Sequence, residues 1–139
     1  MMPLSRCGKV PTAPGKTPVR VLIIDDEPLV RWSLSTGLRL AGYDTLTASC
    51  SAEALTLARQ APHPDVVLLD SRLYDSDPAL LLEDLRLEAP RCRFVILTTS
   101  GHETPIPPWD DATVITKPFD LTEVVQLIGA AVASPPCIA

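Results

Sequence analysis

Three aspartates stand at the ends of two apolar segments. Asp25 is the last residue of the segment 19–25 (VRVLIID), and Asp26 follows it directly. Asp70 is the last residue of the segment 65–70 (DVVLLD). Short, nearly all-apolar runs of this kind are typical of strands buried on both faces of a parallel sheet. If the two strands are neighbours, their carboxylates meet at one edge of the sheet. Like charges this close repel each other, so the pattern predicts a bound cation.

The oxygen-only ligand set favours Mg²⁺, which binds few carboxylates, keeps water ligands and accepts phosphate oxygens. An aspartate beside such an ion can act as a nucleophile toward phosphorus, and Asp70 is the candidate. Two further side chains suit this chemistry. Thr98 ends the apolar run 93–98 and offers a hydroxyl, and Lys117 follows the run 113–116 and offers a positive charge.

Each of these residues also has a purely structural interpretation. Adjacent aspartates often cap a helix, and an aspartate at a strand end is a common turn residue. Thr98 suits a strand for its shape alone, and Lys117 suits a solvated turn. The conjunction favours a site, because all of them fall at the ends of predicted strands.

The elements that must hold these residues alternate along the chain. We expect strands over 19–25, 43–48, 65–70, 93–98 and 113–116. We expect four helices between and after these strands. The first begins at Pro28 and stops at Gly42, the second covers 51–61 and is capped by Ser51, and the third covers 79–88. The last is capped by Asp120 and buries one apolar face: Leu121, Val124, Val125, Ile128 and Val132. Such alternation predicts an α/β fold with a parallel sheet, helices on both faces and a binding crevice at the carboxyl ends of the strands.

The bulk composition indicates one domain. The 139 residues are 46 % hydrophobic, which is enough for one core. We expect a flexible leader over 1–18, a folded domain over 19–133 and a tail over 134–139, because both ends are rich in proline. The net charge of −5, with no basic run, argues against direct binding to nucleic acid or to a membrane surface.

Neither the cysteines nor the apolar runs indicate an oxidising or membrane environment. The four cysteines lie far apart, with no metal-binding spacing: Cys7, Cys50, Cys92 and Cys137. No apolar run is long enough to span a bilayer, and the N-terminus lacks the apolar stretch of a signal peptide. We therefore expect reduced thiols and a cytoplasmic location.

Four motifs resemble the receiver domain of two-component response regulators: LIIDDEPLVRWSL, VVLLDSRL, FVILTT and TKPF. The resemblance covers residues 19–133, and the phrase DDEPLVRWSL also resembles receivers attached to sigma-54-dependent activators. It implies a doubly wound, five-stranded, flavodoxin-like three-layer sandwich with strand order 2-1-3-4-5.

The resemblance also implies roles for single residues. Asp70 would accept a phosphoryl group from a sensor histidine kinase or a phosphotransfer protein. Asp26 and Asp70 would bind Mg²⁺ directly, Asp25 through water, and Arg72 through its backbone carbonyl.

Two more residues would complete the implied site. Thr98 would be the switch hydroxyl. Lys117 would pair with Asp70 and then with the phosphate, and its bond to Pro118 would be cis.

The implied protein is not an enzyme acting on other molecules, but it promotes its own phosphorylation and dephosphorylation. The change in its surface would regulate an output partner or a fused output domain, and a homodimer is one form it could take.

The chain departs from the family pattern in places that transmit the signal. Val114 stands where an aromatic residue is usual, and Thr99 is larger than usual. Pro105, Pro107 and Pro108 predict an atypical or shortened fourth helix, because proline disrupts a helix interior.

These departures keep an alternative open, namely a receiver-like interaction module that works without phosphorylation. The complete set of acids argues against it, since such a module has no use for mutually repelling carboxylates. A phosphatase with an aspartate nucleophile is a third reading, but it would need an acid at the position of Arg72.

Overall fold

Five parallel strands form one sheet in the order β2-β1-β3-β4-β5, as predicted. The computed structural model describes residues 18–70, 78–99, 113–117 and 119–133. The strands are β1 (Arg20–Ile24), β2 (Asp44–Ala48), β3 (Val66–Asp70), β4 (Arg93–Thr99) and β5 (Thr113–Lys117). They differ from the predicted ranges by one residue at some ends.

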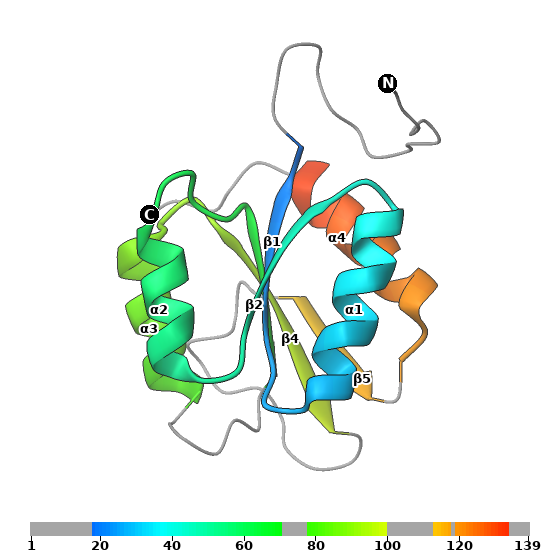
Figure 1. Ribbon diagram of the computed structural model, residues 1–139, viewed down its shortest axis with the longest axis horizontal. Helices are drawn as coiled ribbons and strands as arrows, with labels where there is room; N and C mark the ends of the chain where they lie inside the picture. The colour runs from blue at the N-terminus through cyan, green and yellow to red at the C-terminus, as the bar shows by residue number, and fades with distance from the viewer. Residues whose placement is uncertain (1–17, 71–77, 100–112, 118, 134–139) are drawn as a thin grey trace.

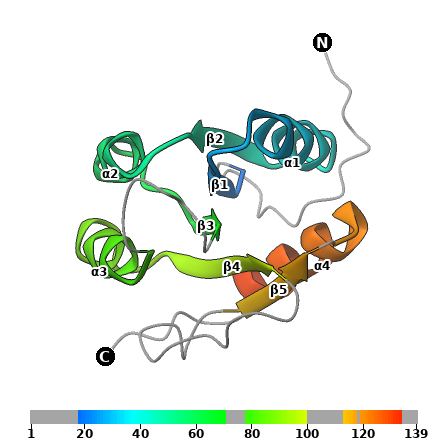
Figure 2. The same cartoon turned by 90° about the horizontal axis from the view of Figure 1, so that it is seen from below.

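Helices cover both faces of the sheet. The described helices are α1 (Pro28–Leu40), α2 (Ser51–Arg59), α3 (Pro78–Glu88) and α4 (Leu121–Ala133). Figures 1 and 2 show α1 and α4 on one face and α2 and α3 on the other. The three-layer flavodoxin-like arrangement is therefore confirmed.

Four of the strands, β1, β3, β4 and β5, contribute side chains to two separate apolar cores, and β2 contributes to one of them. Val21 and Ile23 of β1 pack in the core beneath α1 and α4, whereas Leu22 and Ile24 pack in the core beneath α2 and α3. This alternation follows from the two-residue period of a strand. It explains why the central strands β1 and β3 are almost wholly apolar, because both faces of these strands are buried, whereas Thr47 of the edge strand β2 is exposed.

The predicted ends are confirmed for α1, whereas for α2 the predicted cap is wrong by one residue and the predicted end at 61 is wrong by two, since α2 ends at Arg59. Pro28 begins α1, and Gly42 follows its end with a φ of 102°, which glycine adopts readily. The N-cap of α2 is Cys50, not Ser51. The Glu53 carboxylate turns back to accept a hydrogen bond from the Ser49 amide at 2.9 Å, so this end is closed without a Ser51 cap.

Several predictions fall outside the described residues. They concern the leader, the tail, Arg72, the Lys117–Pro118 bond and the fourth helix expected near Pro105, Pro107 and Pro108. The helix labelled α4 is the one predicted after Asp120. None of the described helices has both the length and the apolar character needed to cross a membrane.

Gly37 of α1 lies against the side chain of Leu121 at the start of α4. A Cβ atom at this position would overlap the side chain of Leu121 at the start of α4. We expect Gly37→Ala to lower the free energy of unfolding by about 1 kcal/mol, because overpacking costs about 1–3 kcal/mol and the helix propensity of alanine returns about 1 kcal/mol. Urea denaturation measures this difference.

Gly129 of α4 is the matched control. A Cβ atom there would lie 3.7 Å from the Tyr43 hydroxyl, which is an ordinary contact. Gly129→Ala should leave stability unchanged or raise it by about 0.5–1 kcal/mol. Equal effects of the two substitutions would contradict the packing argument.

Candidate functional site

Three carboxylates meet at the carboxyl edge of the sheet, which is the lower edge in Figure 1. One oxygen from each of Asp25, Asp26 and Asp70 lies within 4.8 Å of the other two. The topology produces this cluster, because β1 and β3 are neighbours and Ile24 pairs in register with Leu69. The predicted convergence of these aspartates is confirmed.

The three aspartates of the cluster differ in burial. Asp25 is fully buried and Asp70 is 4 % exposed, while Asp26 is half-buried. Burying negative charges is costly unless a positive charge or hydrogen bonds compensate. Three hard oxygen donors fit Mg²⁺, and the half-buried Asp26 leaves an entry path for the ion.

Hydrogen bonds at three different atoms fix Asp25. Its amide donates to the Ala48 carbonyl at 3.2 Å, its Oδ1 accepts from the Glu27 amide at 2.9 Å, and its carbonyl accepts from Nη1 of Arg31 at 2.7 Å. Sequence reasoning did not identify Arg31 as a site residue. Its position six residues after Asp25, in the first turn of the next helix, was the available signal.

The next two strands bring the other predicted residues to the same edge. Asp70 pairs in register with Leu97, so the buried Thr98 lies one residue further along β4. Lys117 ends β5 opposite Thr99. The structure places the backbone of Lys117 at this edge, and its side chain is outside the described part.

Val114 occupies the position where the family pattern has an aromatic residue. It is half-buried, pairs in register with Ile96 and packs against the core beneath α2 and α3. A β-branched side chain has one strongly restricted torsion and little reach. Val114 therefore cannot swing between two positions as a large ring would.

An apolar groove lies between α1 and the start of α4, and its lining begins at Leu29, three residues after Asp26. Its volume is about 320 Å³. It is lined by Leu29, Val30, Ser33, Leu34, Phe119 and Leu121. Leu29 is 77 % exposed, and Trp32 on the same helix is 65 % exposed. Exposed apolar side chains gathered in this way mark an interaction surface, which sequence reasoning did not identify.

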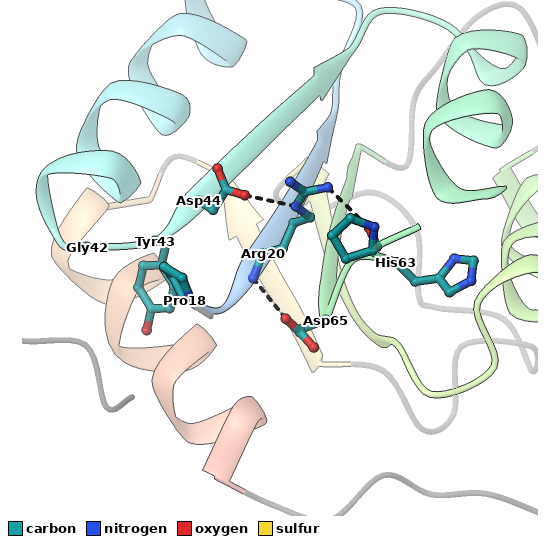
Figure 3. A pocket seen from close by; sticks show the side chains of 8 residues that line it. Pro18, Arg20, Gly42, Tyr43, Asp44, His63 and Asp65 are labelled. Atoms are coloured by element: carbon teal, nitrogen blue, oxygen red, sulfur yellow. Dashed lines mark hydrogen bonds and ion pairs between the residues drawn. The ribbon is translucent and has the colours of Figure 1, made fainter. Parts of the chain in front are cut away.

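A larger pocket of about 440 Å³ lies at the opposite, amino edge of the sheet (Figure 3). Arg20 spans it, with Nε 2.9 Å from Asp44 Oδ2, Nη1 3.2 Å from the Pro62 carbonyl and its amide 2.9 Å from Asp65 Oδ2. These bonds tie β1 to β2 and to the segment before β3. The contacts give this pocket a structural role.

Comparison with known proteins gives a consistent result. The family model for the response regulator receiver domain matches residues 21–129. The probable transcriptional regulatory protein TcrX of Mycobacterium tuberculosis is 38 % identical over 125 residues, covering 81 % of this chain and 49 % of TcrX. The regulatory protein AtoC of Escherichia coli is 35 % identical over 112 residues, covering 78 % of this chain and 24 % of AtoC. The chain thus spans half or less of these relatives.

Solved structures share the fold. A CheY-like receiver domain from Methanospirillum hungatei superposes with a TM-score of 0.73 at 22 % identity, over 84 % of this chain and 94 % of that one. A response regulator from Burkholderia pseudomallei, solved with a phosphorylated aspartic acid, a calcium ion and citrate, gives a TM-score of 0.69 at 26 % identity, over 84 % and 67 %.

Proposed function

The chain belongs to the response regulator receiver family of two-component systems, and from this premise we propose that Asp70 accepts a phosphoryl group in a Mg²⁺-dependent reaction. One observation carries the proposal, namely the three carboxylates within 4.8 Å at the carboxyl edge of the sheet. A scaffold with no ionic chemistry would gain nothing from this mutual repulsion.

The residues divide the reaction between them. Asp25, Asp26 and Asp70 would hold Mg²⁺, which when bound supplies positive charge to the phosphoryl oxygens. A carboxylate oxygen of Asp70 attacks phosphorus, the bond to the donor breaks, and the donor leaves with the electron pair. Thr98 stands one residue beyond the level of Asp70, where its hydroxyl can donate to a phosphoryl oxygen. Lys117 would bring the second positive charge, and the backbone carbonyl of Arg72 would be a further Mg²⁺ ligand.

The proposal is tested by incubating the protein with acetyl phosphate and Mg²⁺ and measuring its intact mass. We expect one added phosphoryl group on the folded protein. A mass that stays unchanged while a known receiver is phosphorylated under the same conditions contradicts the proposal.

A module that works without phosphorylation is the second candidate, and the packing of Val114 favours it. A fixed valine in place of a movable ring removes one common means of transmitting phosphorylation to the surface. Mg²⁺ titration separates the two candidates. Absence of Mg²⁺ binding supports the second candidate and contradicts the first.

The partners follow from the same proposal. A sensor histidine kinase or a phosphotransfer protein would supply the phosphoryl group, and an output partner or output domain would read it. The length of the relatives beyond the matched region supports the output part of this proposal. A homodimer and a cytoplasmic location stay predictions.

The groove between α1 and the start of α4 begins three residues after Asp26, and this place suits the docking of a protein donor. We expect Leu29→Asp to slow phosphotransfer from a histidine kinase at least about tenfold, because truncating a central apolar contact costs about 2 kcal/mol or more. The assay uses the kinase that phosphorylates the wild-type protein fastest in a purified panel. Phosphorylation by acetyl phosphate, which needs no docking surface, should keep its rate.

Leu87 provides the matched control, because it is 81 % exposed on α3, on the opposite face of the sheet. Leu87→Asp should change neither rate. If both substitutions slow the kinase reaction equally, the groove is not the docking surface.

A further inference from the structure

Arg31 reaches the carboxylate cluster from the first turn of α1. Its side chain is half-buried, and Nη1 donates to the Asp25 carbonyl at 2.7 Å, the short distance typical of a charge-assisted hydrogen bond. We propose that Arg31 is a positioning residue for Mg²⁺ binding, which holds the peptide between Asp25 and Asp26 in the orientation that completes the site. This inference rests on the proposed function.

The bonded atom is what gives Arg31 this role. The Asp25 carbonyl belongs to the planar peptide unit that leads to Asp26, so fixing this oxygen fixes the plane and the direction in which Asp26 leaves it. The Asp25 amide and Oδ1 are already bonded to Ala48 and Glu27. Those two bonds hold Asp25 itself, whereas the bond from Arg31 acts on the link to Asp26.

The position of the bond also explains why a side chain is needed here. The paired residues of β1 and β2 end at Ile24 and Ala48, so the Asp25 carbonyl lies beyond the regular ladder. A buried carbonyl requires a hydrogen-bond donor. A helix residue supplies that donor, and the corner between β1 and α1 is thereby tied to the body of α1.

The positive charge of Arg31 and its positioning role predict opposite changes in Mg²⁺ affinity when Arg31 is replaced. A cation near three carboxylates competes with Mg²⁺, so by charge alone its removal should tighten Mg²⁺ binding. By positioning, its removal should weaken binding, because Asp26 becomes less ordered. The bond to a carbonyl rather than to a carboxylate favours positioning as the dominant effect.

The test measures Mg²⁺ affinity by calorimetry on the full chain. We expect Arg31→Met, which keeps the aliphatic stem, to raise the Kd for Mg²⁺ about tenfold, as the loss of one hydrogen bond from a charged group implies. Arg31→Lys, which keeps the charge and one donor, should give a smaller increase. The phosphorylation rate of Arg31→Met with acetyl phosphate should return to within about twofold of wild type at saturating Mg²⁺.

Arg39 provides the matched control, because it is exposed in the last turn of the same helix. Arg39→Met removes the same charge and should leave the Kd unchanged. Thermal unfolding is followed for every variant, and if Arg31→Met does not fold, the comparison of Arg31→Lys with wild type decides.

The possible failures are distinguishable. A wild-type protein that binds no Mg²⁺ overturns the proposed function together with this inference. A wild type that binds Mg²⁺ while Arg31→Met binds it equally or more tightly overturns the positioning role alone. A rate that stays low at saturating Mg²⁺ also overturns it, since a defect confined to metal binding is rescued by the metal.

Discussion

Asp70→Asn should abolish the phosphoryl adduct completely. The amide nitrogen and oxygen of asparagine are far weaker nucleophiles than a carboxylate, while the side chain keeps nearly the same shape. Because Asp70 is buried at the end of β3, the substitution also removes one of three crowded negative charges. We therefore expect a folded protein whose intact mass does not change with acetyl phosphate and Mg²⁺.

Asp84 provides the control for this substitution. It is exposed on α3, outside the carboxylate cluster. Asp84→Asn makes the same chemical change and should leave the adduct intact. If Asp70→Asn is still phosphorylated at the wild-type rate, the acceptor is another residue, and fragmentation of the phosphorylated protein will locate it.

Chelation of divalent metal should slow phosphorylation by at least about 100-fold. Without Mg²⁺, three carboxylates repel the negatively charged phosphoryl oxygens. A metal ion lowers the free energy of such a transition state by several kcal/mol. The measurement is the initial rate of adduct formation from acetyl phosphate with excess EDTA, compared with saturating Mg²⁺.

The effect of removing the metal must be distinguished from the effects of ionic strength and of the chelator itself. Sodium chloride at matched ionic strength replaces the magnesium salt in one sample, and excess Mg²⁺ over EDTA restores the metal in another. Only the second should recover the rate. A full rate in EDTA contradicts a metal-dependent reaction.

The architecture was predictable because its signals are local. The β-branched apolar segments, the proline at the start of α1 and the glycine after it each specify their element without reference to distant residues. The carboxylate cluster was predictable because the ends of neighbouring parallel strands meet at one edge. Asp25, Asp26 and Asp70 needed only the strand order to be placed together.

Contacts that depend on three-dimensional approach were not predictable. Arg31 resembled any other helix arginine, because its partner is a backbone carbonyl, and its place in the first turn after Asp25 was the one indication of the contact. The groove joins Leu29 to Phe119, which lie far apart in the chain. The error at Ser51 has a different cause, because neighbouring residues of an N-terminus compete for the cap position and differ little in energy.

The charge distribution along the strands has a kinetic consequence. At the amino edge Arg20 offsets Asp44, whereas the carboxyl edge gathers three acids. The field at the carboxyl edge attracts divalent cations and repels anions before any contact forms. Under the proposed function, we therefore expect a small anionic phosphodonor to bind after the metal ion has bound. Added salt screens this field, so we expect it to slow the binding of the divalent cation.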